Sequence, residues 1–348
     1  ELFTIGKGEE VAAGDYTTYT EADIKAVARV LTGWSDVSDT QVERFTSGNH
    51  DSGAKQLSAR YGNAVITGGT NEAGARKEVN DLLDIIFAQD ATSKYIIQKL
   101  YRWFVDYIID DEVEQNIIAP LAAQFKQGGF EIKPVLTSLF QSQHFYDAAK
   151  RGAVIKSPAD FMLGTVRTFI TPMLYPGPTE YQGRYWGWRT IRRTMSTMQM
   201  DLMNPPNVAG WAAYWQSPVY HEFWINSDTL QKRIRFTDEL TVNGYQLDEN
   251  YGKTLIDVIE LAKQTSAPGN ITVLVNELCE IAYPLPVPDE SKQKFKQVLL
   301  GGLPDYEWTV EWTDYMNDQT NDAKKTAVEN KLRAMLKYML AMAEYQLM

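Results

Sequence analysis

The sequence has little of the chemistry that disulfides and metal sites require. Its 348 residues include one cysteine, Cys279, and three histidines, His50, His144 and His221. One cysteine cannot form an internal disulfide, and the apolar helical pattern around Cys279 favours a buried thiol. No cysteine–histidine cluster and no histidine pair at helical spacing occurs in the chain. We therefore expect no metal site and no cofactor.

Long hydrophobic runs and excess positive charge are missing as well. No stretch of eighteen apolar residues occurs, so we expect no membrane-spanning segment. Lysine and arginine together number 34 against 45 acidic residues, which gives a net charge of −11. Phosphate binding requires a basic surface, so nucleic acid is not an expected partner. The G-x-S-x-G elbow, the phosphate loop and the dinucleotide fingerprint are also missing, and no familiar enzyme class is indicated.

What is present is mostly helical periodicity. YTEADIKAVARVLTGW at 19–34 has Thr20 as a predicted N-cap and Gly33 as a predicted left-handed helix end. Its expected apolar face consists of Ile24, Val27, Ala28 and Leu31. Further helices are expected at about 71–88, 91–108, 113–127, 132–142, 159–171, 189–202, 227–242, 253–264, 270–283, 289–300, 306–316 and 321–346.

The expected fold is therefore mainly α, a multi-helix globular array with irregular aromatic-rich loops. Glycines and short β-branched runs interrupt the helical pattern at about 35–70, where we expect an extended excursion with at most a small β-hairpin. We divide the chain into residues 1–235 and a C-terminal helical region, 236–348, packed on the first as one unit.

HDSGAK at 50–55 places His50, Asp51 and Lys55 in one glycine-containing loop. One interpretation is a histidine oriented by a carboxylate for acid–base catalysis near neutral pH. The alternative is a turn in which Asp51 caps the following segment and His50 bonds a backbone carbonyl. Adjacent side chains in extended backbone point to opposite faces, so His50 and Asp51 need not meet. These three residues are the candidates for catalysis, and the structural alternative is preferred.

Residues 172–233 combine aromatic, proline and glycine residues. Five of the nine tryptophans lie between 186 and 224. In PPNVAGW at 205–211, the two prolines force an extended path, and Asn207 can hold its own backbone in a turn. One interpretation is a loop sealed by its own aromatics. The other is a partly exposed aromatic platform of the kind that sugars stack on.

An arginine cluster in the same region adds a possible anion site. Arg189, Arg192 and Arg193 lie within two helical turns and have no acidic residue beside them. They form either a solvated basic face or a site for a sulfate or carboxylate. The candidate ligand-binding residues of the region are Trp186, Trp188, Arg189, Arg192, Arg193, Asn207, Trp211, Trp224, Asn226 and Arg233.

Several phrases match one family in sequence and order. They are ELFTIG at 1–6, YTEADIKAVARVLTGW at 19–34, HDSGAK at 50–55, DATSKYIIQKLYRWFV at 90–105, KSPADFMLGTVRTF at 156–169, PPNVAGW at 205–211 and WINSDTLQKR at 224–233. Together they resemble the large uncharacterised bacterial proteins known as domain-of-unknown-function family 1800. The resemblance covers roughly residues 1–235 and brings no established activity, cofactor or catalytic residue.

The resemblance implies export and a longer protein. Members of the family usually have a secretion signal and an N-terminal helical portion before the ELFTIG phrase, so we expect a periplasmic or cell-surface protein that this portion completes. The first expectation is a cell-envelope protein that binds a partner protein or a glycan through residues 172–233. A polysaccharide hydrolase or lyase using His50 is the alternative, and a scaffold subunit of an outer-membrane assembly is a third.

Overall fold

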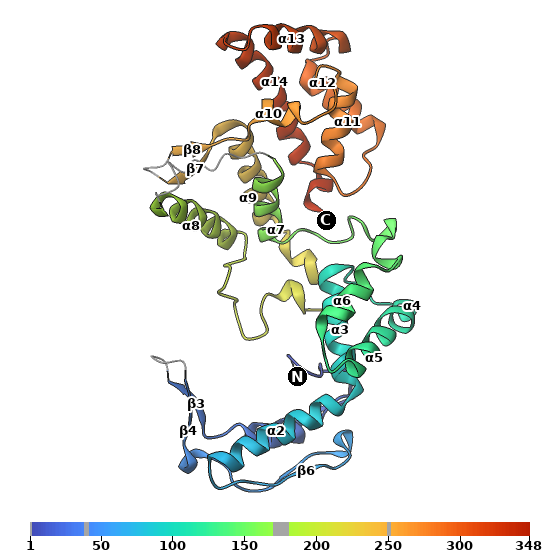
Figure 1. Cartoon of the computed structure of the whole chain (residues 1–348), viewed down its shortest axis with the longest axis vertical. Helices are drawn as coiled ribbons and strands as arrows, with labels where there is room; N and C mark the ends of the chain where they lie inside the picture. Colours follow the sequence, from blue (N-terminus) through green and yellow to red (C-terminus); the bar gives the residue numbers. More distant parts are fainter. Residues whose placement is uncertain (1, 38–41, 170–180, 249–251) are drawn as a thin grey trace. The chain divides into compact units, whose positions relative to one another are not determined.

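The structure, a computed structural model, describes residues 2–37, 42–169, 181–248 and 252–348 (Figure 1). The chain divides into two compact units, Glu1–Tyr146 (unit 1) and Asp147–Met348 (unit 2). This division differs from the boundary expected at 235, because helices on the two sides of residue 235 pack together within unit 2. Helices dominate both units, which confirms the mainly α fold class.

The described residues of unit 1 contain a group of packed helices, two further helices and three short strand pairs. Its helices are α1 (Glu21–Val30), α2 (Glu72–Ala88), α3 (Asp90–Phe104), α4 (Asp111–Val113), α5 (Ala119–Gln127) and α6 (Ile132–Phe140), with a π-helical turn at Glu114–Ile118. Helices α3, α5 and α6 share one apolar core around Tyr101 and Phe125. A second core, around Val30 and Leu82, joins α1 and α2 to the loop that runs between them.

Helix α1 shows how a polar contact changes the buried face. Thr20 forms the predicted N-cap, in a capping box with Asp23. The buried residues of α1 are Asp23, Ala26 and Val30. Of the expected apolar face, Val27 packs partly buried against this core, but Ala28 and Leu31 are exposed, so the face is wrong at these two positions. Ser58 donates two hydrogen bonds of 2.7 Å to the Asp23 carboxylate, from its backbone N and its Oγ. Burial favours a higher pKa for Asp23, but the bonds from Ser58 and Thr20 hold this pKa below its ordinary value.

Unit 2 contains the remaining helices. They are α7 (Pro158–Thr168), α8 (Tyr181–Thr197), α9 (Ser227–Asp238), α10 (Val258–Lys263), α11 (Ile271–Ala282), α12 (Asp289–Leu300), α13 (Asp305–Asn317) and α14 (Asp322–Leu340). Helix α14 packs against α9, α10, α12 and α13 and supplies Leu336 and Met339 to the apolar core of the unit (Figure 1). Cys279 is a buried free thiol in the same core, as its sequence context predicts.

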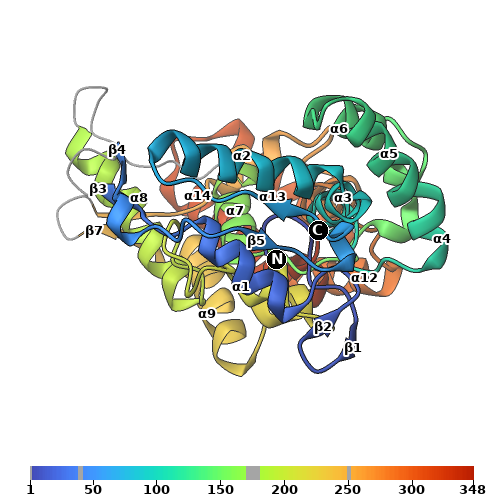
Figure 2. The same cartoon turned by 90° about the horizontal axis from the view of Figure 1, so that it is seen from below.

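Four short antiparallel strand pairs occur in the described residues, although at most one hairpin was expected. They are β1 (Glu10–Ala12) with β2 (Asp15–Tyr16), β3 (Trp34–Val37) with β4 (Val42–Phe45), β5 (Lys55–Gln56) with β6 (Val65–Ile66), and β7 (Tyr245–Asp248) with β8 (Gly252–Thr254). Two of the pairs lie outside 35–70. Figure 2 shows β5 alongside α1 and α2. Strand β5 contacts α1 and strand β6 contacts α2, so this pair links the two helices. Each strand is two to four residues long, which is too short for an alternating pattern of apolar and polar residues to be recognised in the sequence.

Candidate functional site

A buried carboxylate, Glu78 of α2, forms the centre of the loop that contains the catalytic candidates. Glu78 lies between Ala75 and Leu82 on the buried stripe of α2 and is not exposed. Its Oε1 accepts from His50 Nε2 at 3.0 Å and from the backbone N of Gly69 at 2.5 Å, and its Oε2 accepts from Lys55 Nζ. Burial alone favours a higher pKa for Glu78, but the bonds from Lys55, Gly69 and His50 hold this pKa below its ordinary value.

The ring of His50 is held on both sides. Its Nδ1 lies 2.8 Å from the carbonyl oxygen of Thr32, and its Nε2 faces Glu78. Both partners are acceptors, so the geometry fits a ring that donates from both nitrogens. Gly33 makes this approach possible: at φ +81°, a Cβ on Gly33 would lie 2.9 Å from the Cβ of His50. The predicted left-handed Gly33 is confirmed, and the position also requires the absence of a side chain.

Asp51 does not orient His50, so that part of the catalytic interpretation is wrong. The Asp51 carboxylate pairs with Arg29, with Oδ2 at 2.7 Å from Nε and Oδ1 at 3.0 Å from Nη2. The backbone N of Gly53 donates to Oδ1 at 2.9 Å, in the turn that the sequence indicates. The Arg29 guanidinium, with Gly53, holds the pKa of Asp51 well below its usual range.

The His50 cluster, which we define as His50, Lys55 and Glu78, is closed to solvent. The side chains of His50, Lys55 and Glu78 are 1%, 0% and 0% exposed. Lys55 Nζ also donates to the backbone oxygen of Asp51. The Lys55 ammonium therefore contacts the Glu78 carboxylate and a backbone carbonyl rather than solvent. A general base needs one ring nitrogen open to substrate, and His50 has neither open. The cluster fastens the loop that follows α1 onto α2.

Helix α8 carries five of the ligand-binding candidates and exposes most of them. It begins eight residues before the expected start at 189, in the segment YQGRYWGW, where two glycines and four aromatic residues hide the helical pattern. Its buried stripe includes Gly183, Gly187 and Ile191. Thr190 Oγ1 donates to the carbonyl oxygen of Leu247 at 2.6 Å, which fixes α8 against β7.

The opposite face of α8 is aromatic and basic. The side chains of Tyr181, Tyr185 and Trp188 are exposed, and the Arg189 guanidinium lies 4.4 Å from the ring centroid of Trp186. Arg192 is partly neutralised, because its Nη2 lies 2.7 Å from Asp201 Oδ1. Arg189 and Arg193 have no carboxylate partner in the described part of the chain.

The loop before α9 is held by its own side chains. Trp224 is 3% exposed, and its ring centroid lies 5.6 Å from that of Tyr214. Trp211 is half-buried, with its ring centroid 6.3 Å from that of Tyr214. Asn207 Oδ1 accepts from the backbone N of Ala209 at 2.8 Å, the self-turn that the sequence predicts. At Trp224, the loop is therefore closed by its own aromatic side chains, as the first of the two interpretations expects.

Asn226 and Arg233 also have structural contacts. Asn226 is the N-cap of α9, in a capping box with Thr229. Arg233 is fully buried: its Nη2 donates to the carbonyl oxygen of Lys156 at 2.7 Å, and its guanidinium lies over Phe161. Burial lowers the pKa of Arg233 to about 10, and burial beside Arg233 lowers the pKa of Lys156 to about 8.

Sequence reasoning missed Glu78 and Lys156. Glu78 was detectable in principle, because an acidic residue on the apolar stripe of a helix needs a buried partner. Lys156 opens the phrase KSPADF, but its proximity to Arg233 depends on contact between segments 77 residues apart.

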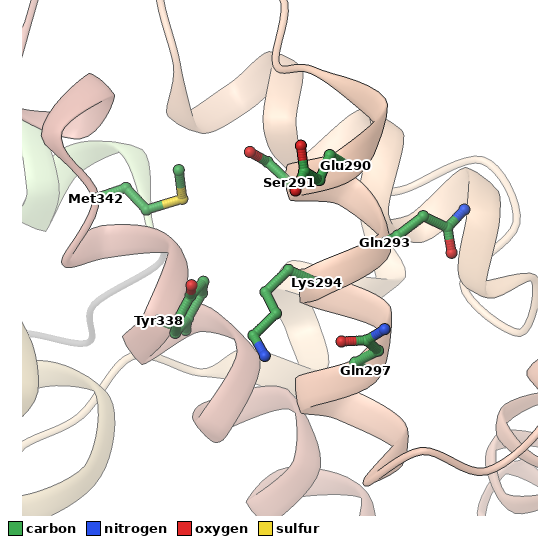
Figure 3. A pocket seen from close by; sticks show the side chains of 7 residues that line it. All are labelled: Glu290, Ser291, Gln293, Lys294, Gln297, Tyr338 and Met342. Carbon is green, nitrogen blue, oxygen red and sulfur yellow. The ribbon is translucent and has the colours of Figure 1, made fainter.

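A hollow of about 410 Å³ lies between α12 and the C-terminal end of α14. Figure 3 shows the side chain of Lys294, on α12, directed toward the side of the hollow where Tyr338 of α14 lies. Its lining consists of surface side chains, and none of its acidic or basic groups is buried. These residues indicate no particular chemistry. In the ranges that the structure describes, no three acidic, histidine or cysteine side chains gather as a metal site, and no helix has the length and hydrophobicity to cross a membrane.

The fold and the sites define a class of helical protein with a closed ionic cluster in unit 1 and an exposed aromatic–basic helix in unit 2. The chain belongs to the family described as protein of unknown function (DUF1800), whose model matches residues 1–347. The match extends through the C-terminal helices, beyond the residues that carry the resemblance in sequence. No curated protein and no solved structure matches the chain.

Proposed function

We propose that this is an exported cell-envelope protein that binds an anionic glycan on the exposed face of α8. The observation that carries the proposal is the composition of that helix. Its 17 residues include four arginines, four aromatic residues and no acidic residue, in a chain whose net charge is −11. The envelope location is proposed from the family resemblance.

The exposed aromatic residues are arranged along the helix. Tyr181, Tyr185 and Trp188 are 61%, 72% and 42% exposed. Their spacing of four and three residues places them on one face, over a length of about 10 Å at 1.5 Å per residue. Side chains so spaced suit the apolar faces of successive sugar rings in a linear polymer. Helix α8 is fixed to β7, so a ligand would meet a preformed face.

Charge determines which glycan suits this face. Arg189 and Arg193 have no carboxylate partner among the described residues, so they are available to a ligand. Guanidinium groups bind carboxylates and sulfates through paired hydrogen bonds. A uronate or sulfated polysaccharide supplies both the apolar ring face and the anion, whereas an acidic peptide supplies mainly the anion. These features favour the glycan over a protein partner.

The hydrolase alternative has no support in the His50 cluster. A catalytic His50 needs an open nitrogen and a cleft, and its side chain is 1% exposed with Thr32 and Glu78 on its two nitrogens. A binding role requires no such base. Glycan binding without turnover is therefore the function that these observations favour.

The test measures binding of polygalacturonate, with uncharged dextran as the comparison, by isothermal titration calorimetry. We expect polygalacturonate to bind and dextran not to bind. The double variant Tyr185→Ala/Trp188→Ala should weaken polygalacturonate binding at least about fivefold, because each exposed ring contact contributes about 0.5–1.5 kcal/mol. The matched control is Tyr306→Ala, since Tyr306 is 63% exposed on α13, and it should bind like the original chain.

A second pair of variants tests the arginines. Arg189→Gln/Arg193→Gln should weaken binding and reduce its sensitivity to salt, because screened ion pairs are removed. Arg235→Gln, at a site 80% exposed on α9, should change neither property. Equal affinity for polyglutamate and polygalacturonate would show that charge alone decides, and would overturn the glycan proposal.

A further inference from the structure

A hollow in unit 1 lies between the β3–β4 hairpin and α2, which are neighbours in Figure 1. Its volume is about 490 Å³, within the size range of small-molecule sites. Leu31, Trp34 and Val79 supply apolar surface, and Ser35, Asp36 and Asn80 supply polar groups. These residues come from the end of α1, from β3 and from α2, and they do not overlap with α8.

One ion-pair arrangement shapes the wall of this hollow. Arg76 Nη1 lies 2.6 Å from Glu43 Oε1 and Nη2 lies 3.0 Å from Glu72 Oε1, and the guanidinium stands 4.9 Å from the ring centroid of Trp34. Trp34 is also paired across the hairpin with Phe45, at 5.0 Å between ring centroids. Arg76 thus links the hairpin, through Glu43, to α2, and its side chain forms part of the wall of the hollow.

The other polar groups of the hollow have no partner in the chain as described. The side chains of Ser35, Asp36 and Asn80 make no hydrogen bond or ion pair with the described residues. The indole Nε1 of Trp34 is buried and lacks an acceptor among them. A buried indole N–H usually has an acceptor, so this donor is an exception to that pattern.

The charges of the lining restrict the ligand. Arg76 is balanced by Glu43 and Glu72, while the Asp36 carboxylate has no cation beside it among the described residues. An anion would be repelled by Asp36. The Asp36 carboxylate and the Asn80 amide beside apolar surface suit a ligand with several hydroxyl groups and one apolar face. We propose that this hollow binds a single neutral pyranose ring.

The pocket goes beyond the proposed function and does not depend on it. It accepts a neutral sugar in unit 1, whereas α8 is proposed to bind an anionic polymer in unit 2. The two sites therefore respond to different ligands and different variants. If both proposals are correct, the chain binds neutral sugar residues of a glycan in the hollow and charged sugar residues on α8.

The test is saturation-transfer NMR and calorimetry on the whole chain with glucose, galactose, N-acetylglucosamine and glucuronate. We expect at least one neutral sugar to bind saturably and glucuronate to bind at least tenfold more weakly. Asn80→Ala should weaken the neutral sugar about tenfold without changing the melting temperature, because Asn80 is exposed. Asn116→Ala, at another exposed asparagine of unit 1, is the matched control and should bind normally.

A charge variant makes the proposal sharper. Asp36→Asn keeps the shape of the side chain and should narrow the difference between glucose and glucuronate. Tyr185→Ala/Trp188→Ala should leave the binding of monosaccharides unchanged, which separates this pocket from α8. The absence of saturable binding by every neutral sugar, or unaltered binding in Asn80→Ala, would overturn the proposal.

Discussion

The His50 cluster and the face of α8 both combine charged and aromatic neighbours, yet they differ in what their polar groups contact. In the His50 cluster, every charged side chain meets another charge or a backbone group and is closed to solvent. On α8, Arg189 and Arg193 have no carboxylate partner among the described residues, and three aromatic rings are exposed. The residue types in the two places suggest chemistry equally well. Only the second arrangement leaves groups available for a ligand.

Removing the central carboxylate should have the largest effect. Glu78→Ala leaves Lys55 buried without its counter-charge, and we expect a loss of about 3–5 kcal/mol in the free energy of unfolding. Urea denaturation measures it. The control is Glu72→Ala on the exposed side of α2, which should cost under about 1 kcal/mol. Equal losses would show that the buried cluster is not a special contributor to stability.

Two tryptophans of the aromatic region should behave in opposite ways. Trp224→Ala removes a ring that is 3% exposed and should cost about 3–5 kcal/mol, as for other buried large aromatics. Trp188→Ala, at a ring 42% exposed, should change stability by about 0.5 kcal/mol or less. Thermal unfolding of both variants provides the comparison. A large loss in Trp188→Ala would place that ring in the core and remove it from the binding face.

The free energy of unfolding should depend on pH through Glu78 in the acid range and through Lys156 in the alkaline range. The pKa of Glu78 is lowered from an ordinary value of 4.5, so its contribution to stability is complete above about pH 4.5 and is lost as the pH falls through the folded-state pKa. The pKa of Lys156 is lowered from 10.5 to about 8, so the unfolded chain binds more protons between these values. Stability should therefore rise with pH in that range.

Paired variants separate these two dependences. The stability difference between the original chain and Glu78→Gln should shrink as the pH falls below 4.5. In Lys156→Met, the alkaline rise between pH 8 and 10.5 should be smaller than in the original chain. Chemical denaturation across pH measures both. An unchanged alkaline slope in Lys156→Met would assign the rise to other groups.

The smallest effect on stability is expected from Arg193, which has no carboxylate partner among the described residues. Arg193→Gln should change the unfolding free energy by about 0.5 kcal/mol or less, because no ion pair with the described residues is lost. A chemical denaturation curve tests this. A larger loss would indicate that Arg193 stabilises the fold, and would weaken its assignment to ligand binding.

Much of the helical pattern was predictable because local signals agree with burial. The helix expected at 71–88 is α2 at Glu72–Ala88, and the one expected at 289–300 is α12 at Asp289–Leu300. The helix expected at 189–202 is α8 at Tyr181–Thr197, so its start was predicted eight residues too late and its end five residues too late. The late start arises because Gly183 and Gly187 lower helix propensity but lie buried in the unit. Tertiary packing compensates for a local preference there.

The candidate sites were less predictable, because they depend on which polar groups find partners. The sequence identified His50, Asp51 and Lys55 as neighbours, but it did not reveal that Arg29 pairs with Asp51 and Glu78 with the other two. The three residues 50, 51 and 55 are joined to α1 and α2 by contacts over 18 to 28 positions. Such contacts follow from the fold and leave no local pattern.

The sequence by itself determined the helical class, the family, the capping of α1 at Thr20 and the left-handed conformation of Gly33. These depend on side chains and backbone angles within a few residues, or on phrases read in order. The tertiary structure decided which charges are enclosed and which are exposed. Burial changes the free energy of a charged group by several kcal/mol, and this depends on every segment packed around it. For that reason the same kinds of residue became a closed structural cluster around Glu78 and an exposed face on α8.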